Sequence, residues 1–146
     1  MKVQEIMTKD CACCTRDTKL QDVARLMVQN DCGAIPVIED SSNRIIGILT
    51  DRDIVLRSIA AGKNPMDLTA ADCMTTNVYV CEMNSDVQDC CKTMEEHCVR
   101  RIPVVDDNRA CRGIVAQADI ARECPDPVVA EVLKEVSQPV RVAGGR

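Results

Sequence analysis

The sequence predicts an α/β (α+β) fold built from two similar halves, each with the order strand, helix, strand, strand, helix, and a C-terminal helix after them. Three observations lead to this prediction: an internal repeat, apolar positions with helical spacing, and short β-branched runs separated by turn residues. With 146 residues, the chain falls within the usual size of one compact domain or of two halves that share a core.

Four segments of the first half match the second half in the same order, which indicates an internal duplication. Three pairs share a shift of 67 residues (74 − 7), and the fourth has a shift of 66 (113 − 47) after one deleted residue. The pairs are 3–8 with 70–75, 20–23 with 87–90, 35–37 with 102–104, and 47–54 with 113–120.

The boundary between the halves lies in segment 61–65, where Gly62 and Pro65 follow a helical pattern, as expected where a helix ends. Each half should therefore contain the same elements. The predicted parts are a first repeat at 1–62, a linker at 63–66, a second repeat at 67–124, and a C-terminal helix and tail at 125–146.

The first helix of each half is predicted from its start signal and its apolar stripe. Thr18 with Gln21, and Ser85 with Gln88, have the spacing of a capping box, in which two side chains satisfy unpaired N–H groups at a helix start. Behind the first box, the apolar residues fall at i, i+3, i+4, i+7 and i+8, which is typical of a helix that faces a core. These residues are Leu20, Val23, Ala24, Met27 and Val28.

Strands and further helices follow in order. Short β-branched runs at Ala34 to Ile38 and at Arg44 to Leu49, separated by turn-forming residues, predict two strands joined by a turn, and a further strand is expected around Ala12 to Cys14. The second helices are predicted at 51–61 and 117–123, the latter ended by Pro125. Valines at four-residue spacing within 127–136 predict the terminal helix.

Composition excludes several classes of function. The chain has one Tyr, no Phe and no Trp, and its net charge is −5, so the core must be aliphatic and nucleic-acid binding through aromatic stacking and a basic groove is not expected. No stretch approaches the roughly 20 apolar residues of a membrane span, and the start has no apolar run of a signal peptide. We therefore expect a cytoplasmic protein that does not contact membranes.

The eleven Cys are expected to be mostly reduced thiols that pack as small hydrophobic groups, because their number is odd and no export signal is visible. The best candidates for thiol chemistry are Cys11-x-Cys13-Cys14 and Cys90-Cys91. Neither has the Cys-x-x-Cys spacing of a zinc or thioredoxin-like site, and adjacent residues of a strand point to opposite faces. The single His97 is expected at the surface or at a helix end.

The ordered segments closely resemble a motif of the CBS (cystathionine β-synthase type) domain, and the second half repeats the motif with weaker matches. The first copy consists of Met7-Thr8, a helix, then 33–37 (Gly-Ala-Ile-Pro-Val) and 47–54 (Gly-Ile-Leu-Thr-Asp-Arg-Asp-Ile). The resemblance implies a stand-alone regulatory pair of repeats packed about a pseudo-twofold axis, with two clefts. It also implies a homodimer and an adenosyl ligand of the AMP, ADP, ATP, S-adenosylmethionine or NAD type, without a required metal.

The residues themselves support a nucleotide site at a strand-to-helix junction. Thr50 and Asp53 stand there three residues apart, where a helix N-terminus offers N–H groups that favour a phosphate. The resemblance implies that Asp53 binds the ribose in one cleft, with Thr50 close to the phosphate, and that Asp119 marks the other cleft. An ordinary acid in a first helical turn is the alternative interpretation of Asp53.

The second cleft departs from this pattern, because Ala116 replaces the hydroxyl residue. The resemblance implies that Arg100 and Arg101 reach the phosphates there, and arginine suits that task because its planar group pairs with phosphate oxygens. Solvated charges at a strand start are the alternative. We expect this to be the principal cleft, with the adenine near Cys32, Gly33 and Ala12; the remaining predicted nucleotide-binding residues are Ile114, Ile48, Val99 and Val78.

Three hypotheses on function remain open. The first is a non-catalytic module that senses an adenine nucleotide and acts through its own dimer or a separate effector protein. The second is a redox or metal sensor based on thiols, and the third is a structural dimerisation module with vestigial clefts, suggested by Ala116. An enzyme is not expected, because the sequence has no nucleophile–base pair and no glycine-rich phosphate loop.

Overall fold

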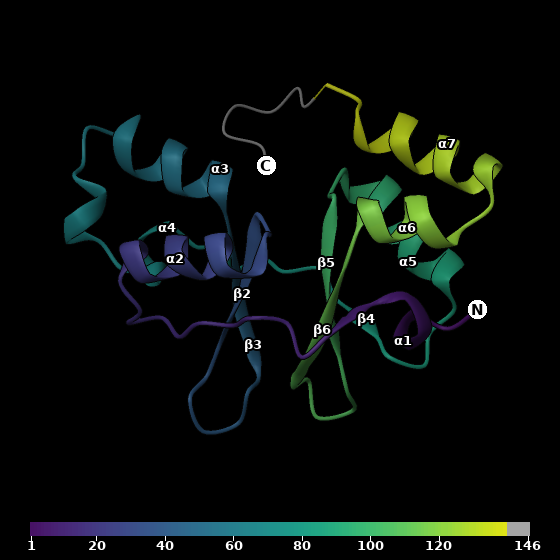
Figure 1. The fold of residues 1–146 in the computed structure, drawn as a ribbon, viewed down its shortest axis with the longest axis horizontal. Helices are drawn as coiled ribbons and strands as arrows, with labels where there is room; N and C mark the ends of the chain where they lie inside the picture. The colour runs from purple at the N-terminus through teal and green to yellow at the C-terminus, as the bar shows by residue number, and fades with distance from the viewer. Residues whose placement is uncertain (140–146) are drawn as a thin grey trace. The chain divides into compact units, whose positions relative to one another are not determined.

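The computed structural model describes residues 1–139 and forms two compact units, each of which contains parts of both sequence repeats (Figure 1). Of the described residues, the first unit contains 1–9, 79–104 and 112–139, and the second contains 10–78 and 105–111. The described part has no helix long and apolar enough to cross a membrane. Of the predicted C-terminal helix and tail, residues 140–146 lie outside the described residues.

The second unit contains the main helices and strands of the first repeat, followed by the linker and the start of the second repeat. Its elements are α2 (Leu20–Asn30), β2 (Ala34–Ile38), β3 (Ile45–Thr50), α3 (Asp51–Ile54), the π-helix η1 (Val55–Ile59), the 3-10 helix η2 (Pro65–Asp67) and α4 (Ala70–Cys73). Strands β2 and β3 are antiparallel, with Ala34 opposite Thr50, so the two predicted strands are confirmed. The predicted second helix is also confirmed, but its second half is a π-helix.

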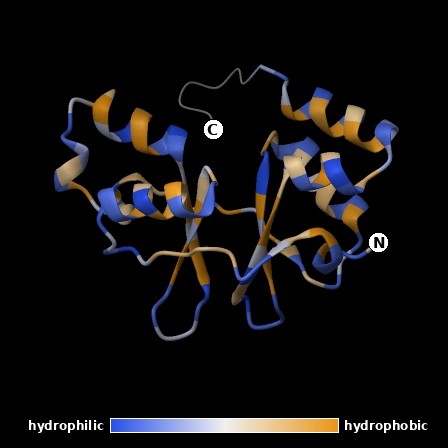
Figure 2. Ribbon diagram, in the orientation of Figure 1, coloured by the Kyte–Doolittle hydropathy of each residue, from blue (hydrophilic) through white to orange (hydrophobic). Residues whose placement is uncertain are grey.

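The core of the second unit lies between α2 and the β2–β3 pair. Leu20, Val23 and Leu49 are buried in it, and alternate residues of β3 face it as the pleat of a strand requires. Figure 2 shows β2 and β3 as mainly hydrophobic and the turn between them as hydrophilic. The predicted stripe of α2 is too wide, because Ala24 and Val28 are exposed and α2 contacts the core over a narrower face.

The first unit holds most of the second repeat together with the start of the chain. Its elements are α1 (Val3–Ile6), β1 (Thr8–Lys9), β4 (Cys81–Glu82), α5 (Val87–His97), β5 (Arg101–Val105), β6 (Cys111–Ala116), α6 (Gln117–Glu123) and α7 (Asp126–Val136). The strand order is β1-β6-β5-β4. The predicted helix at 117–123 is confirmed, and the terminal helix begins one residue before its predicted start, with Val132 and Val136 fully buried.

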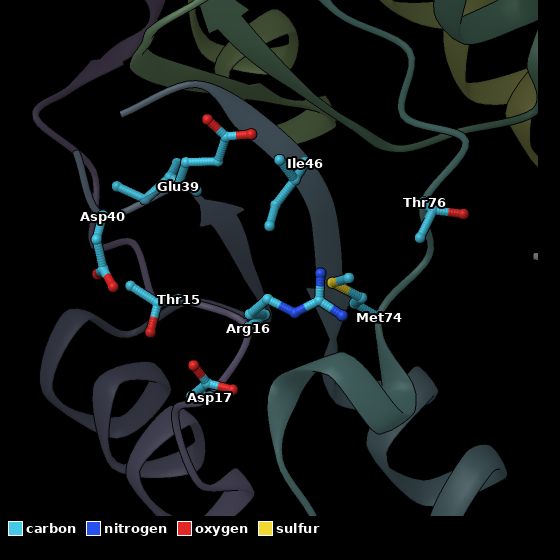
Figure 3. Close-up of a pocket in the computed structure, with 9 residues that line it drawn as sticks. Thr15, Arg16, Asp17, Glu39, Asp40, Ile46, Met74 and Thr76 are labelled. Carbon is cyan, nitrogen blue, oxygen red and sulfur yellow. The ribbon is translucent and has the colours of Figure 1, made fainter. Parts of the chain in front are cut away.

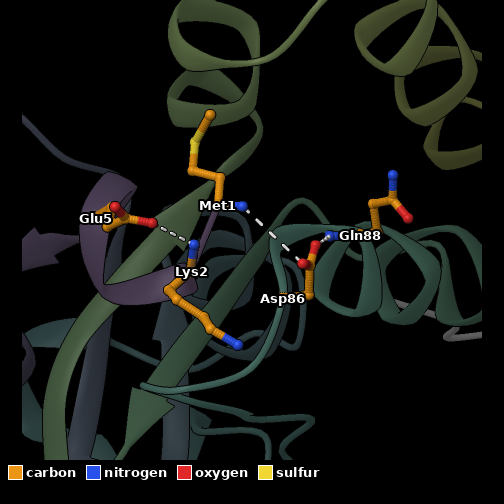
Figure 4. A network of polar contacts seen from close by, with 5 residues as sticks. All are labelled: Met1, Lys2, Glu5, Asp86 and Gln88. Carbon is orange, nitrogen blue, oxygen red and sulfur yellow. Dashed lines mark hydrogen bonds and ion pairs between the residues drawn. The ribbon is translucent and has the colours of Figure 1, made fainter.

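The start of the chain is attached to the second repeat by backbone and polar contacts. Val3 N–H donates to the Ser85 carbonyl (2.9 Å), and Lys2 and Asp86 form an isolated antiparallel bridge. The Met1 amino group lies 4.0 Å from Asp86, and Glu5 accepts a hydrogen bond from the Lys2 N–H (Figure 4). These contacts explain why residues 1–9 belong to the first unit.

Both predicted capping boxes are wrong by one residue. The Thr18 hydroxyl accepts from the Thr15 N–H (3.1 Å) in a turn before α2, and the N-cap position is Lys19. At α5 the cap is Asp86, whose carboxylate accepts from the Gln88 N–H (3.0 Å). The Thr18 hydroxyl is used inside the turn before α2, and Asp86, the residue after Ser85, is the stronger cap of α5. The spacing of a capping box does not reveal either competitor.

The strand predicted around Ala12 to Cys14 is reduced to one parallel bridge between Cys14 and Val37. Cys14 N–H donates to the Pro36 carbonyl (3.0 Å), and Ile38 N–H donates to the Cys14 carbonyl (2.8 Å). Of residues 12–14, Cys14 alone is therefore paired with β2.

Candidate functional site

The carboxylate of Asp53 caps the short helix that follows β3. Its Oδ2 accepts from the Thr50 N–H (3.0 Å), while its own N–H donates to the Thr50 hydroxyl (3.1 Å). Asp53 is only 4% exposed, although aspartate is rarely buried. Among the described residues no hydrogen bond reaches Oδ1 of Asp53, so this oxygen is available to a ligand hydroxyl. The role of a first-turn acid and the role of a ligand group are therefore compatible here.

Asp119 occupies the equivalent place in the first unit and is equally buried. Its Oδ2 accepts from the Ala116 N–H (2.7 Å), and its Oδ1 pairs with Arg122 at 2.5 Å. The Arg122 side chain is 63% exposed, so solvent weakens this ion pair. A ligand that used both oxygens of Asp119 would have to displace Arg122, whereas Asp53 has no such competitor.

The predicted phosphate-binding arginine Arg100 lies beside the junction that holds Asp119. Its carbonyl accepts a hydrogen bond from the Gln117 N–H (2.8 Å), as the Gly33 carbonyl accepts from Asp51 N–H (3.0 Å) in the second unit. Arg100 is exposed and Arg101 is half-buried at the start of β5. The first unit thus brings the backbones of Arg100, Ala116 and Asp119 together.

The side-chain oxygen Oε1 of Gln117 is buried without a hydrogen-bond partner, and within residues 1–139 it is the one buried side-chain N or O atom in this state. Buried polar atoms are normally satisfied, so this acceptor is suited to a donor from a bound molecule. Gln117 is the first residue of α6, two positions before Asp119. Because α6 has seven residues and α3 has four, their N-terminal dipoles are weak sources of affinity for an anion.

The predicted residues divide between the two units. The first unit contains Asp119, Arg100, Arg101, Ala116, Ile114 and Val99, and the second contains Thr50, Asp53, Ile48, Gly33, Cys32, Ala12 and Val78. The structure brings together members of each group at the two β–α junctions. The association of the two groups in one nucleotide site stays a prediction.

Arg57, one of the basic residues near Thr50, has a structural task. Its Nη1 donates to the carbonyls of Cys73 and Met74, both at 2.9 Å. This guanidinium therefore holds the chain after α4 and is not directed to a phosphate. Arg52, on α3, is exposed.

A separate pocket of about 420 Å³ lies within the second unit, and it contains none of the predicted nucleotide-binding residues (Figure 3). Ile46 and Met74 contribute apolar surface to it. Its charged groups are Arg16, Asp17, Glu39 and Asp40, three acids against one base, which does not favour a polyphosphate. No sequence pattern predicted this pocket.

Five of the eleven cysteines are buried in the cores: Cys14 and Cys73 in the second unit, and Cys81, Cys90 and Cys91 in the first, where Cys124 is partly buried against the same core. His97 lies in the last turn of α5 and stacks on Tyr79, with ring centroids 3.7 Å apart, which confirms its predicted place at a helix end.

Three further thiols gather at one place in the second unit. The sulfur atoms of Cys11, Cys13 and Cys111 all lie within 4.8 Å of one another. Hydrogen bonding to Cys111, then to Cys13, and burial raise the pKa of Cys11. At Cys13, the hydrogen bond with Cys11 lowers the pKa. The hydrogen bond with Cys111 and burial together outweigh it and raise the pKa of Cys13 to about 12. The sequence predicted Cys11 and Cys13 as candidates and missed Cys111, which is 98 residues from Cys13.

Comparison with known proteins identifies the repeats. The CBS domain family matches residues 3–59 and 70–126. The chain is 36% identical over 140 residues, 96% of each chain, to Hypoxic response protein 1 of Mycobacterium tuberculosis.

Solved structures have the same fold. A crystal structure of Hypoxic Response Protein I with two coordinated zinc ions is 38% identical, with a TM-score of 0.77 over 86% of this chain and 100% of that chain. The CBS domain pair of protein MJ0100, in complex with 5′-methylthioadenosine and S-adenosyl-L-methionine, is 24% identical, with a TM-score of 0.75 over 84% of this chain and 94% of that chain. At this identity the likeness to MJ0100 concerns the fold.

Proposed function

This chain belongs to the CBS domain family, and from that premise we propose that it is a non-catalytic regulatory module whose ligand is an adenine nucleotide or another adenosyl compound. The observation that carries the proposal is the pair of buried aspartates, Asp53 and Asp119, at equivalent β–α junctions of the two repeats. A ribose offers two neighbouring hydroxyl donors, which suit a carboxylate in a partly dry site. The fold of the MJ0100 pair can hold adenosyl ligands.

We propose that Asp119, Arg100 and Arg101 form the principal ligand-binding group and that Thr50 and Asp53 form a second. The arginines supply charge for phosphates, and the buried oxygen of Gln117 supplies an acceptor beside Asp119. The adenine is proposed to contact Cys32, Gly33 and Ala12. The repeats are proposed to span residues 1–62 and 67–124.

Calorimetric titration with AMP, ADP, ATP, S-adenosylmethionine and NADH tests this proposal. The expected result is saturable binding of at least one ligand, with affinity reduced at least about tenfold in Asp119→Ala, about 1.4 kcal/mol. Asp119→Asn, which keeps an acceptor for the Ala116 N–H, serves as the folding control. Absence of binding at millimolar ligand would refute the function, whereas binding that survives both Asp119→Ala and Asp53→Ala would refute the site.

The roles of the two arginines are separable by ligand. Arg101→Ala is expected to weaken ATP binding more than S-adenosylmethionine binding, because only ATP carries phosphates for the guanidinium to pair with. Equal losses for both ligands would contradict a phosphate-binding role. Arg52→Ala is the matched control, since Arg52 is an exposed arginine on α3.

We further propose that two copies of the chain associate through the exposed apolar side chains of η1. The exposed fractions there are 50% for Val55, 43% for Leu56 and 63% for Ile59. Exposed apolar side chains that gather on one face usually mark a contact with another molecule. Light scattering after gel filtration should give the mass of a dimer, and Ile59→Glu should give a monomer. A dimer that tolerates Ile59→Glu would place the contact elsewhere.

Regulation by a metal ion is a second candidate function. Two observations favour it: the zinc ions in the 38% identical Hypoxic Response Protein I, and the three neighbouring thiols of the second unit. The metal content of the full chain, purified without a metal-affinity step and measured by mass spectrometry, tests it. About one ion per chain is expected. A metal content below about one tenth of an ion per chain, together with no uptake of added Zn²⁺, would exclude this function.

A further inference from the structure

The cysteine cluster of the second unit has the geometry of a metal site. The sulfurs of Cys11, Cys13 and Cys111 lie within 4.8 Å of one another, and those of Cys13 and Cys111 are 4.0 Å apart. Within residues 1–139 this is the one group of three or more His, Cys, Asp or Glu residues whose ligand atoms gather so closely. The 4.0 Å separation is about twice the 2.05 Å length of a disulfide bond, so these two sulfurs are not joined.

The β2–β3 hairpin holds both parts of the cluster in place. On one side, Cys14 is bound to β2 through Pro36 and Ile38, which fixes the segment that carries Cys11 and Cys13. On the other side, Cys111 N–H donates to the Asn43 carbonyl (2.9 Å), just before β3. The adjacent bridge between Arg44 and Ala110 strengthens this attachment. The three sulfurs are therefore brought together by the backbone before any ion binds.

The spacing of the sulfurs suits a thiophilic ion. Two thiolates on a tetrahedral ion with metal–sulfur bonds of about 2.3 Å lie about 3.8 Å apart. The 4.0 Å between Cys13 and Cys111 is close to this value, and small side-chain rotations would bring in Cys11. All three residues are half-buried, so an ion can reach them from solvent while the sulfurs remain partly shielded from water.

We propose that Cys11, Cys13 and Cys111 bind one thiophilic metal ion, Zn²⁺ or Cu⁺, through three thiolates. This proposal rests on the second candidate function and adds the residues that hold the ion. On binding, three S–H bonds break, three metal–sulfur bonds form, and three protons pass to the buffer. Zn²⁺ would complete its tetrahedron with a water molecule, whereas Cu⁺ is satisfied by the three soft ligands.

The ion would connect two segments that are far apart in the chain. It would join residues 11–13, which precede α2, to the first residue of β6. Both segments belong to the second unit, so the ion would cross-link this unit internally. Its presence should then raise the thermal stability of the protein, because it binds the folded chain in preference to the unfolded one.

Metal titration of the reduced full chain under anaerobic conditions tests the proposal. Co²⁺ is the first probe, because sulfur-to-cobalt charge-transfer absorption reports thiolate ligands, and competition by Zn²⁺ then gives the Zn²⁺ affinity. A second titration uses Cu⁺ against a Cu⁺ chelator. One equivalent of either ion per chain is expected, and Cys111→Ser should weaken its binding at least about tenfold.

Cys98→Ser is the matched control, because Cys98 is a half-buried thiol like those of the cluster but lies in the first unit, outside the cluster. It should bind the ion as the wild type does. Equal ion affinity in the wild type and in the triple variant with Cys11, Cys13 and Cys111 all changed to Ser would refute the cluster as the site while leaving metal-dependent regulation standing. Failure of the wild type to bind any of the three ions would refute both, and nucleotide binding, measured separately, would decide the first proposed function.

Discussion

A single methyl group added at Gly113 should destabilise the fold, and its counterpart Gly47 provides the matched control. An added Cβ at Gly113 would lie 2.5 Å from the Thr8 carbonyl oxygen, in the backbone of β1. At Gly47 the nearest atom would be the Met74 sulfur at 2.8 Å, and the nearest backbone atom the Thr75 oxygen at 3.1 Å. The two glycines occupy the same place in the two repeats, so their surroundings alone distinguish them.

The expected loss of stability in Gly113→Ala follows from how far the backbone of Thr8 must move. Restoring an ordinary contact of 3.4 Å requires Thr8 to retreat by 0.9 Å (3.4 − 2.5), against the pairing of β1 with β6. Overpacking of this kind costs about 1–3 kcal/mol, and replacing Gly by Ala returns about 0.5–1 kcal/mol through the unfolded chain. We expect Gly113→Ala to lower the free energy of unfolding by about 1–2 kcal/mol, and Gly47→Ala by less than about 0.5 kcal/mol because the Met74 side chain can rotate.

Urea unfolding followed by far-UV circular dichroism measures this difference, since the chain has no Trp to report by fluorescence. In thermal unfolding the same loss should lower the Tm of Gly113→Ala by about 2–8 °C. The reasoning from the contact distances would be refuted if Gly113→Ala were as stable as the wild type. It would also be refuted if Gly47→Ala were less stable than Gly113→Ala.

Three other substitutions should change stability in predictable directions. The Gln88 N–H, then the nearby amino groups, hold the pKa of Asp86 below its ordinary value of 3.8, so its contribution is present above that pH and is lost on acidification. Asp86→Ala should therefore lower the urea midpoint at pH 7, and a deficit that persists near pH 2 would contradict this. Burial, then the acidic side chains of α7, raise the pKa of Glu95 above 4.5, so its penalty applies above the raised pKa and is relieved as the pH falls. Glu95→Gln should raise the midpoint at pH 7 and not at pH 4, and a gain at both would point to packing instead. Arg57→Ala should cost about 1–3 kcal/mol in urea unfolding, because two carbonyls lose a charged donor, while Arg52→Ala should cost nothing measurable.

The sequence was sufficient where a local signal decides the structure. The strand Ala34–Ile38 and the helix Gln117–Glu123 have their predicted bounds, since a β-branched run between turns and a helix stopped before Pro125 leave few alternatives. It was insufficient where neighbours compete for one role. Whether a hydroxyl or the adjacent acid caps α5 depends on the turn that precedes it, and spacing does not encode that turn.

The candidate sites show a second limit of sequence reasoning. The aspartates were found because the repeat places them at equivalent positions, and the motif predicts a junction at each. The thiol cluster could not be found in the same way, because Cys111 and Cys13 meet only through the packing of the β2–β3 hairpin. The ion pair of Asp119 with Arg122 was not predicted either. A spacing of three residues on a helix permits such a pair but does not require it.

The repeated Met-Thr pair gains a physical meaning from the glycine contacts. Met7 and Thr8 lie against Gly113 in the first unit, and Met74 and Thr75 lie against Gly47 in the second. Each Met-Thr segment thus packs on the glycine-containing strand of the other repeat, and at Gly113 the missing Cβ is what lets the backbone of Thr8 lie so close. This exchange explains why the compact units do not coincide with the repeats. It also means that neither repeat completes this packing by itself within the chain, because each supplies the Met-Thr segment that covers the strand of the other.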